Sequence, residues 1–193
     1  EGLANLQLGN VFFRPDSIIS RDFSVLVACK QLHESINSTK KLTWLDLMAG
    51  TGIRSLRWGI ESNLISKNCL RGSPKVRILV NDANIEGYDL VKKNITQIRK
   101  KNISFQVKNE NAERLLCKFF LKEEFIDLID IDCFGSPNYL LQPAFKALVF
   151  GGILLLSSTD SKSTTGHDRK ASLRRYGASS RVHPSSWEIA LRL

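Results

Sequence analysis

The stretch from residue 42 to residue 65 constrains the fold more than any other part of the chain. An apolar run, LTWLDLM, is predicted as a buried strand over residues 42–48. The small-residue turn AGTG follows, and residues 53–65 are predicted as a helix. A strand that passes through glycines directly into a helix is typical of a parallel α/β sheet. Such a turn also lets a ligand approach the backbone at the helix N-terminus.

The rest of the chain repeats this alternation, which predicts a doubly wound, Rossmann-like α/β fold with helices on both faces of the sheet. We expect residues 1–160 to form this domain and residues 161–193 to be a polar, basic, weakly patterned segment. The further predicted strands are 76–81, 103–107, 125–132 and 151–159; the further predicted helices are 22–36 with Asp22 as N-cap, 84–101, one from Ala112, and 138–149, interrupted or kinked by Pro143.

The net charge of +9 and the isoelectric point near 9.6 favour a polyanionic partner. No apolar stretch approaches the roughly 20 residues of a membrane span, so nucleic acid is preferred over membrane. Two segments, 92–101 and 168–181, carry much of the surplus. The first is equally well explained as a solvated helix face, whereas the second holds Tyr176, which could stack on an unpaired base.

The four cysteines lack the CxxC spacing of a zinc or redox site, so no metal is expected. They are interpreted as reduced thiols of an intracellular protein, whose compartment is not defined, and a monomer is favoured. Because the chain has no initiator Met and its last residues, WEIALRL, stop within an apolar pattern, we expect a fragment of a longer protein that continues into a C-terminal domain.

Three strand ends carry candidate ligand-binding residues. Asp46, Gly50 and Gly52 surround the first turn, whose acid followed by A-G-T-G is closer to the first motif of class I methyltransferases than to the NAD fingerprint. Asp82 ends the second strand, where an acid binds ribose hydroxyls or, alternatively, caps the next helix. The Asn111–Ala112 step after the third strand could face an adenine, with a helix cap at Asn111 as the alternative.

The segment DIDCFGSP, residues 130–137, closes the fourth strand and carries the candidate catalytic residues. Asp132 could accept a proton from an exocyclic base amine, and the ring of Phe134 could hold the base in line. Alternatively, Asp132 caps the following turn. Asp130 shares a strand face with Asp132, so one of the two is expected to have a raised pKa or a basic partner.

With these residues in view, the chain resembles the tRNA (guanine-26) N2-dimethyltransferase family. The motifs that carry the resemblance are EGLANL (1–6), VFFRPDSIISRDFSVLV (11–27), LDLMAGTGIRSLRWG (45–59), VNDAN (80–84), DLIDIDCFGSP (127–137), GGILLLSSTD (151–160), LRRYG (173–177) and EIALRL (188–193). The resemblance implies methyl transfer from S-adenosyl-L-methionine to N2 of a guanine in tRNA.

The resemblance also assigns roles to residues. It implies that Arg21 and Arg54 hold the carboxylate region of S-adenosyl-L-methionine, that Asp82 binds its ribose, and that Asn111 and Ala112 lie by its adenine. Asp132 would be the catalytic acceptor, with Phe134 helping to hold a flipped guanine.

The chain departs from the family pattern at several positions. Cys133 stands where the family has Pro, which frees a backbone N–H and suggests a looser loop; Cys133 itself is interpreted as a filler without a chemical role. Phe13-Arg14-Pro15, Ser20 and Asn111 replace Tyr-Asn-Pro, Asn and Asp. Two alternatives therefore stay open: a non-catalytic tRNA-binding relative, and a methyltransferase for another RNA position or a small molecule.

Overall fold

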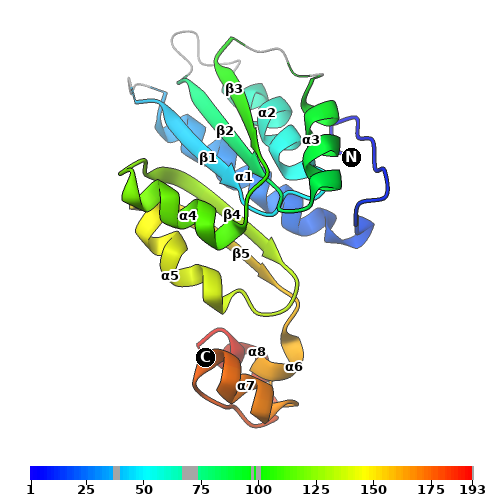
Figure 1. The fold of residues 1–193 in the computed structure, drawn as a ribbon, viewed down its shortest axis with the longest axis vertical. Coiled ribbons are helices and arrows are strands. Elements are labelled where there is room, and N and C mark those ends of the chain that lie inside the picture. Colours follow the sequence, from blue (N-terminus) through cyan, green and yellow to red (C-terminus); the bar gives the residue numbers. More distant parts are fainter. Residues whose placement is uncertain (37–39, 67–73, 97, 99–100, 193) are drawn as a thin grey trace.

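The computed structural model describes residues 1–36, 40–66, 74–96, 98 and 101–192. Within these residues, a sheet of five parallel strands runs in the order β3-β2-β1-β4-β5 (Figure 1). The strands are β1 (Leu42–Asp46), β2 (Val76–Asn81), β3 (Ile103–Lys108), β4 (Ile126–Cys133) and β5 (Leu148–Ser158). The order reverses between β1 and β4, where doubly wound sheets bind ligands at the carboxyl ends of their strands. The predicted fold class is confirmed.

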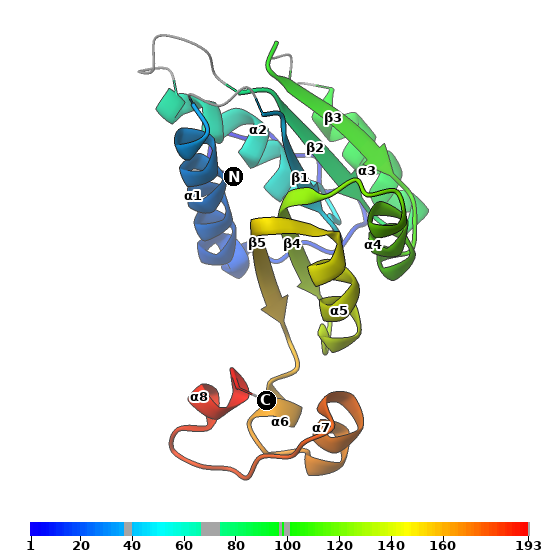
Figure 2. The ribbon, with the colours of Figure 1, turned by 90° about the vertical axis from the view of Figure 1, so that its left-hand side faces the viewer.

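Helices cover both faces of the sheet. The first layer holds α1 (Ile18–Glu34), α2 (Ile53–Ser66) and α3 (Ile85–Ile95), and the second holds α4 (Ala112–Leu121) and α5 (Asn138–Ala147) (Figures 1 and 2). Beneath the first layer, the buried rings of Trp44 and Trp58 pack edge to face with centroids 6.0 Å apart. Because both faces are covered, β1 is buried at every position, as parallel sheets require.

Helix α1 begins earlier than predicted. A 3₁₀ turn, η1 (Pro15–Ser17), leads into Ile18, and Asp22 lies inside α1 rather than at its N-cap. Proline at the first position of the turn has a backbone angle suited to starting a helix, which explains the earlier start. Asp22 instead forms an ion pair with Arg57 at 2.6 Å.

Strand β5 also begins earlier than predicted, directly after α5, which passes through Pro143 without interruption. Ile126 pairs with Leu148, whereas Leu128 pairs with Ile153, so three extra residues of β5 form an irregularity there. The Gly151–Gly152 pair, expected to open the strand, lies within this irregularity. Bulges of this kind place glycines inside strands and hide the true strand start from sequence patterns.

Residues 161–192 form a small lobe rather than an unpatterned tail. Its helices are α6 (Ser161–Thr164), α7 (Arg169–Tyr176) and α8 (Ser186–Ala190), and they lie beyond the ends of β4 and β5 (Figures 1 and 2). Asp160 organises the lobe by accepting hydrogen bonds from Ser163, Arg175 and Tyr176. Such polar contacts leave no periodic apolar signal in the sequence, which is why these helices were not predicted.

Two predictions reach beyond the described residues. Cys69, interpreted above as a reduced thiol, lies outside them, as does part of the basic segment 92–101. Helix α3, predicted to run to residue 101, ends at Ile95.

Candidate functional site

Acidic side chains of β1 and β4 meet at the point where the strand order reverses. Asp46 is paired with Asp130 in the β1–β4 register, and both are almost completely buried. Asp132 lies two residues further along β4, and its side chain is 42% exposed. The carboxyl edge of the sheet therefore presents one accessible carboxylate above two buried ones.

Arg54, at the start of α2, joins the two acids of β4. Its guanidinium lies 2.6 Å from Oδ2 of Asp132 and 3.3 Å from Oδ2 of Asp130. The same group donates to the hydroxyl of Ser20 at 3.1 Å. Although burial lowers the pKa of Arg54, the neighbouring carboxylates of Asp130 and Asp132 raise it above its ordinary value, so the guanidinium is charged. The expected basic partner is thus Arg54, whose contact with the carboxylate of a cofactor remains a prediction.

The two buried acids hold protons more tightly than ordinary carboxyls. Burial raises the pKa of Asp46 to about 7, the charge of Asp130 adds to this, and hydrogen bonds from Ser55 oppose it. Burial likewise raises the pKa of Asp130 to about 6, against the effects of Arg54 and Ser24. Asp130 therefore fulfils the expectation that one acid of the pair on β4 has a raised pKa.

The turn after β1 is fastened to β2 by Asp82. The backbone N–H of Gly50 donates to Oδ2 of Asp82 at 2.7 Å, and the N–H of Asn84 donates to Oδ1 at 2.8 Å. Gly50 and Gly52 have φ angles of +55° and +78°, which side-chain-bearing residues rarely adopt. The N-cap of α3 is Asn84, so the alternative role of Asp82 as that cap is wrong.

Gly87 is a site residue that sequence reasoning missed. A Cβ at this position would lie 2.9 Å from Cγ of Asp82, closer than real Cβ contacts. The glycine therefore leaves the space in which the Asp82 carboxylate lies against α3. The only sequence signal is a glycine five residues after an acid, inside a helix where glycine is unfavourable.

The loop after β3 is joined to the same edge. Asn81 donates to the carbonyls of Leu47 and Glu110, both at 3.0 Å, which links the ends of β1, β2 and β3. Asn111 caps α4 by accepting from the N–H of Arg114, which confirms the capping alternative, and Ala112 is buried at the first position of α4. An adenine contact by either residue remains a prediction.

Two exposed aromatic rings stand beside the accessible carboxylate. Phe134 follows Asp132 by two residues and is 70% exposed, and its ring packs edge to face on Phe12 with centroids 4.8 Å apart. Phe12 is itself 63% exposed and was not singled out from the sequence. Two exposed rings in contact form an apolar patch of the kind that a ligand or partner can cover.

Arg21 makes contacts other than those expected. Its guanidinium donates to the Glu1 carboxylate and to the carbonyls of Arg14 and Pro15, and its side chain is 5% exposed. These contacts fix the N-terminal segment, whose Phe12 carbonyl would lie 3.7 Å from a Cβ on Gly50. In this structure Arg21 supports the segment that carries Phe12, and its contact with a cofactor remains a prediction.

Cys133 is buried at the end of β4. Its side chain packs in the core cluster that includes Leu140 and Ala144, and burial raises the pKa of its thiol. A buried protonated thiol is a weak nucleophile, which agrees with its interpretation as a filler. The following loop is held by β5: the N–H of Gly135 donates to Thr159 Oγ1 at 2.7 Å, and Ser158 donates to the Gly135 carbonyl at 2.8 Å.

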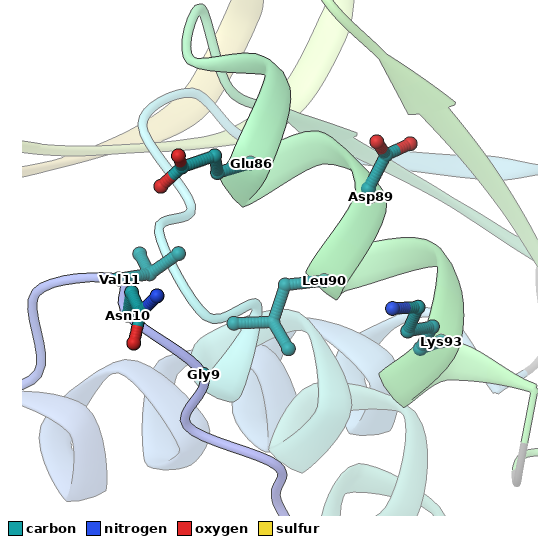
Figure 3. Close-up of a pocket in the computed structure, with 7 residues that line it drawn as sticks. All are labelled: Gly9, Asn10, Val11, Glu86, Asp89, Leu90 and Lys93. Atoms are coloured by element: carbon teal, nitrogen blue, oxygen red, sulfur yellow. The ribbon is translucent and has the colours of Figure 1, made fainter.

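A cavity of about 340 Å³ lies between the N-terminal segment and α3 (Figure 3). None of the predicted site residues lines it; its lining consists of Gly9, Asn10, Val11, Glu86, Asp89, Leu90 and Lys93. Among the described residues, no group of three His, Cys, Asp or Glu side chains is placed to hold a metal ion. In the same part of the chain, no helix has the length and apolar character needed to cross a membrane.

The chain is similar to a known protein family and to curated proteins. A family model described as N2,N2-dimethylguanosine tRNA methyltransferase matches residues 5–193. A tRNA (guanine(26)-N(2))-dimethyltransferase of Pyrobaculum islandicum is 34% identical over 182 residues, which are 94% of this chain and 45% of that protein. The protein of the same name from Methanocaldococcus jannaschii is 33% identical over 184 residues, 95% of this chain and 46% of its own. The chain thus spans about half the length of these relatives.

Solved structures show the same fold. Trm1 from Pyrococcus horikoshii, solved with S-adenosyl-L-methionine, matches with a TM-score of 0.76 and 22% identity over 98% of this chain and 50% of that one. A SAM-dependent methyltransferase from Agrobacterium tumefaciens matches with a TM-score of 0.54 and 15% identity over 76% of this chain and 45% of that one. At these identities the two structures support the fold alone.

Proposed function

Because the chain belongs to the N2,N2-dimethylguanosine tRNA methyltransferase family, we propose that its protein transfers a methyl group from S-adenosyl-L-methionine to the exocyclic N2 of a guanine in tRNA, at position 26. The observation that carries the proposal is the family match over residues 5–193. The geometry at the ends of β1, β2 and β4 supports it, because residues suited to each step lie along one edge.

The residues of this edge fit S-adenosyl-L-methionine, a nucleoside with a cationic sulfonium. Asp82 lies half-buried beside the glycine turn, where a carboxylate accepts hydrogen bonds from ribose hydroxyls. The ends of β1 and β4 carry the carboxyl groups of Asp46, Asp130 and Asp132 and the guanidinium of Arg54. Acidic groups therefore outnumber basic ones, which suits a cationic ligand. In our proposal Gly50, Gly52, Asp46, Asn111 and Ala112 complete the cofactor site.

Asp132 is assigned the role of proton acceptor. S-adenosyl-L-methionine, held by Asp82 and the glycine turn, would supply an electrophilic methyl group for guanine N2 and would leave as S-adenosylhomocysteine. The lone pair of guanine N2 is delocalised into the ring. A hydrogen bond from the N2 amine to an acceptor makes this lone pair available to bond the methyl group. Asp132 provides that acceptor and takes the proton released from N2, while Arg54 orients its carboxylate at 2.6 Å.

Phe12 and Phe134 are assigned to hold the base. A guanine inside a stem must leave the stack to reach an enzyme, at a cost of a few kcal/mol, and aromatic faces offset part of this cost. The two rings are exposed, come from distant parts of the sequence and pack against each other, and Phe134 follows Asp132 by two residues. Arg21 holds the segment that follows Phe12, and Thr159 holds the loop that follows Phe134.

Mass spectrometry of nucleosides tests the function. We expect N2-methylguanosine or N2,N2-dimethylguanosine in unmodified tRNA after incubation with the protein and S-adenosyl-L-methionine, and its absence with Asp132→Ala. Calorimetric titration with S-adenosyl-L-methionine separates the alternatives: binding without product would identify a non-catalytic relative. Product at another nucleotide, or product undiminished in Asp132→Ala, would refute the assignment.

A further inference from the structure

The lobe formed by residues 161–192 carries a large share of the positive charge of the chain. It contains seven Lys and Arg residues and two acids, Asp168 and Glu188. Asp168 accepts a hydrogen bond from the N–H of Ala171 as the N-cap of α7, and Glu188 pairs with Arg192. The acids of the lobe are thus engaged locally and leave most of its cations without a counter-charge.

The cations gather on the solvent face of α7. Arg169, Lys170 and Arg174 are exposed, whereas Ala171 and Ser172 are buried against the lobe. Lys170 and Arg174 lie four positions apart and therefore share one side of the helix. None of the three cations forms an ion pair with a described residue, unlike Arg175, which binds Asp160 at 2.8 Å.

The lobe is fastened to the loop that holds Phe134. Nδ2 of Asn138 donates to the carbonyl of Arg175 at 2.6 Å, and the side chain of Tyr176 interacts with Ser136. The Tyr176 hydroxyl donates to Asp160, so this residue, expected from the sequence to stack on a base, serves here as a link within the lobe. These contacts hold α7 in a defined position relative to the candidate catalytic loop.

The lobe also lies close to the edge of the sheet that carries the candidate site. The carboxyl ends of β4 and β5 point toward the lobe (Figures 1 and 2), so α7 lies beyond the edge of the sheet at which β4 ends with Asp132 and Cys133. A polyanion that reaches Asp132 with one nucleotide extends over neighbouring surface with the next ones, because successive phosphates are spaced by several ångströms.

We propose that the exposed face of α7, with Arg169, Lys170 and Arg174, is a docking surface for the phosphates of the RNA substrate. This face holds the RNA strand that leads into the candidate active site. The contacts from Asn138 and Tyr176 fix the position of α7 relative to the loop that carries Phe134. The proposal rests on the proposed function for the identity of the polyanion. Phosphate contacts fix orientation without reading sequence, so this face contributes affinity rather than base choice.

The test compares two triple variants of equal charge change. Arg169→Gln/Lys170→Gln/Arg174→Gln removes the cations of α7 and leaves Arg175 and its Asp160 contact in place. Lys41→Gln/Lys75→Gln/Lys122→Gln removes three exposed cations that precede β1, β2 and β4, at the opposite edge of the sheet. Dissociation constants for an unmodified tRNA transcript are measured over a series of salt concentrations, alongside S-adenosyl-L-methionine binding as a check on folding.

We expect the α7 variant to bind tRNA roughly tenfold or more weakly at moderate salt, with the slope of log affinity against log salt reduced by about 2 to 3. The control variant should differ from the unaltered protein by less than threefold. Equal weakening by both variants, an unchanged slope in the α7 variant, or no salt-dependent tRNA binding by the unaltered protein would overturn the inference. Binding without guanine methylation refutes only the proposed function, and the α7 comparison then still decides the docking surface.

Discussion

Asp130 and Asp132 are two residues apart on one strand, yet their surroundings differ sharply. Asp130 is buried and accepts hydrogen bonds from Arg54 and Ser24, and burial raises its pKa to about 6. Asp132 shares the same arginine but reaches solvent. A group that exchanges a proton with a substrate must be accessible, so the accessible acid is the one that we assign to catalysis.

Replacing Asp132 with Asn tests this assignment with little change in size. The amide keeps a carbonyl oxygen for Arg54 but accepts protons poorly, so we expect the rate of guanine methylation to fall about 10²- to 10⁴-fold. S-adenosyl-L-methionine affinity should change less than threefold, as measured by calorimetry. Activity within threefold of the unaltered protein would contradict a proton-accepting role.

Gly87 allows a test of the role of Asp82, because a substitution there adds a single methyl group next to its carboxylate. In Gly87→Ala the new methyl group displaces the Asp82 carboxylate, which would otherwise lie 2.9 Å from it. We expect S-adenosyl-L-methionine to bind roughly tenfold more weakly, because the ribose acceptor has moved. Alanine is the better helix former by about 1 kcal/mol, which offsets part of the stability that is lost with the hydrogen bonds of Asp82 to Gly50 and Asn84.

The control for this variant is Glu86→Ala, on the preceding, exposed position of α3. It also introduces an alanine into the first turn of α3, without touching Asp82. Equal cofactor affinity in Gly87→Ala and Glu86→Ala would show that the position of Asp82 has no part in binding.

At the scale of elements, β5 governs the loop that carries Phe134. Cys133 in place of the family proline suggested a loose loop, but Thr159 and Ser158 of the β5 end fasten both polar atoms of Gly135. A proline at position 133 would restrict the loop through its own backbone. The hydrogen bonds of Gly135 restrict the loop through the neighbouring strand instead. The orientation of the Phe134 ring therefore depends more on the end of β5 than on the residue at position 133.

Thr159→Val removes the hydroxyl that holds the N–H of Gly135. We expect kcat for tRNA methylation to fall roughly tenfold, because small misplacements of positioning groups are costly, while cofactor affinity stays within twofold. Thr43→Val, in the amino half of β1, is the matched control and should keep its kcat. An unchanged kcat in Thr159→Val would show that the loop is held by other contacts.

Some elements followed from local pattern and others did not. The bounds of β2 and the start of α4 at Ala112 agree with prediction, because apolar alternation and an asparagine cap are properties of a few adjacent residues. The starts of α1 and β5 do not agree, because a 3₁₀ turn and a bulge changed the local register. The lobe helices were missed because hydrogen bonds to Asp160 organise them.

At the scale of the whole molecule, packing β1 against β4 places Asp46 beside Asp130. The folded protein holds a proton on Asp46 up to about pH 7, whereas the unfolded chain loses it near pH 4. Between these values the folded state binds more protons than the unfolded state. The free energy of unfolding therefore decreases as pH rises through this window.

Asp46→Asn removes this titration, while its amide oxygen can still accept from Ser55. Relative to the unaltered protein, we expect the variant to gain about 2 kcal/mol of stability between pH 5 and pH 8. Urea unfolding at the two pH values measures the difference, and Asp89→Asn, an exposed acid on α3, serves as the charge control. A difference that is the same at both pH values would contradict the raised pKa of Asp46.

The sequence by itself determined the succession along the chain of the five strands and of helices α1 to α5, and the placement of acids at strand ends. These depend on residues within a few positions of one another, and parallel strands bring their carboxyl ends to one edge. Only the tertiary structure decided that Arg54 joins Asp130 to Asp132, that Phe12 meets Phe134, and that Gly87 makes room for Asp82. Most of these contacts join segments far apart in the chain, and all of them are set by how helices pack on the sheet, which no local pattern encodes.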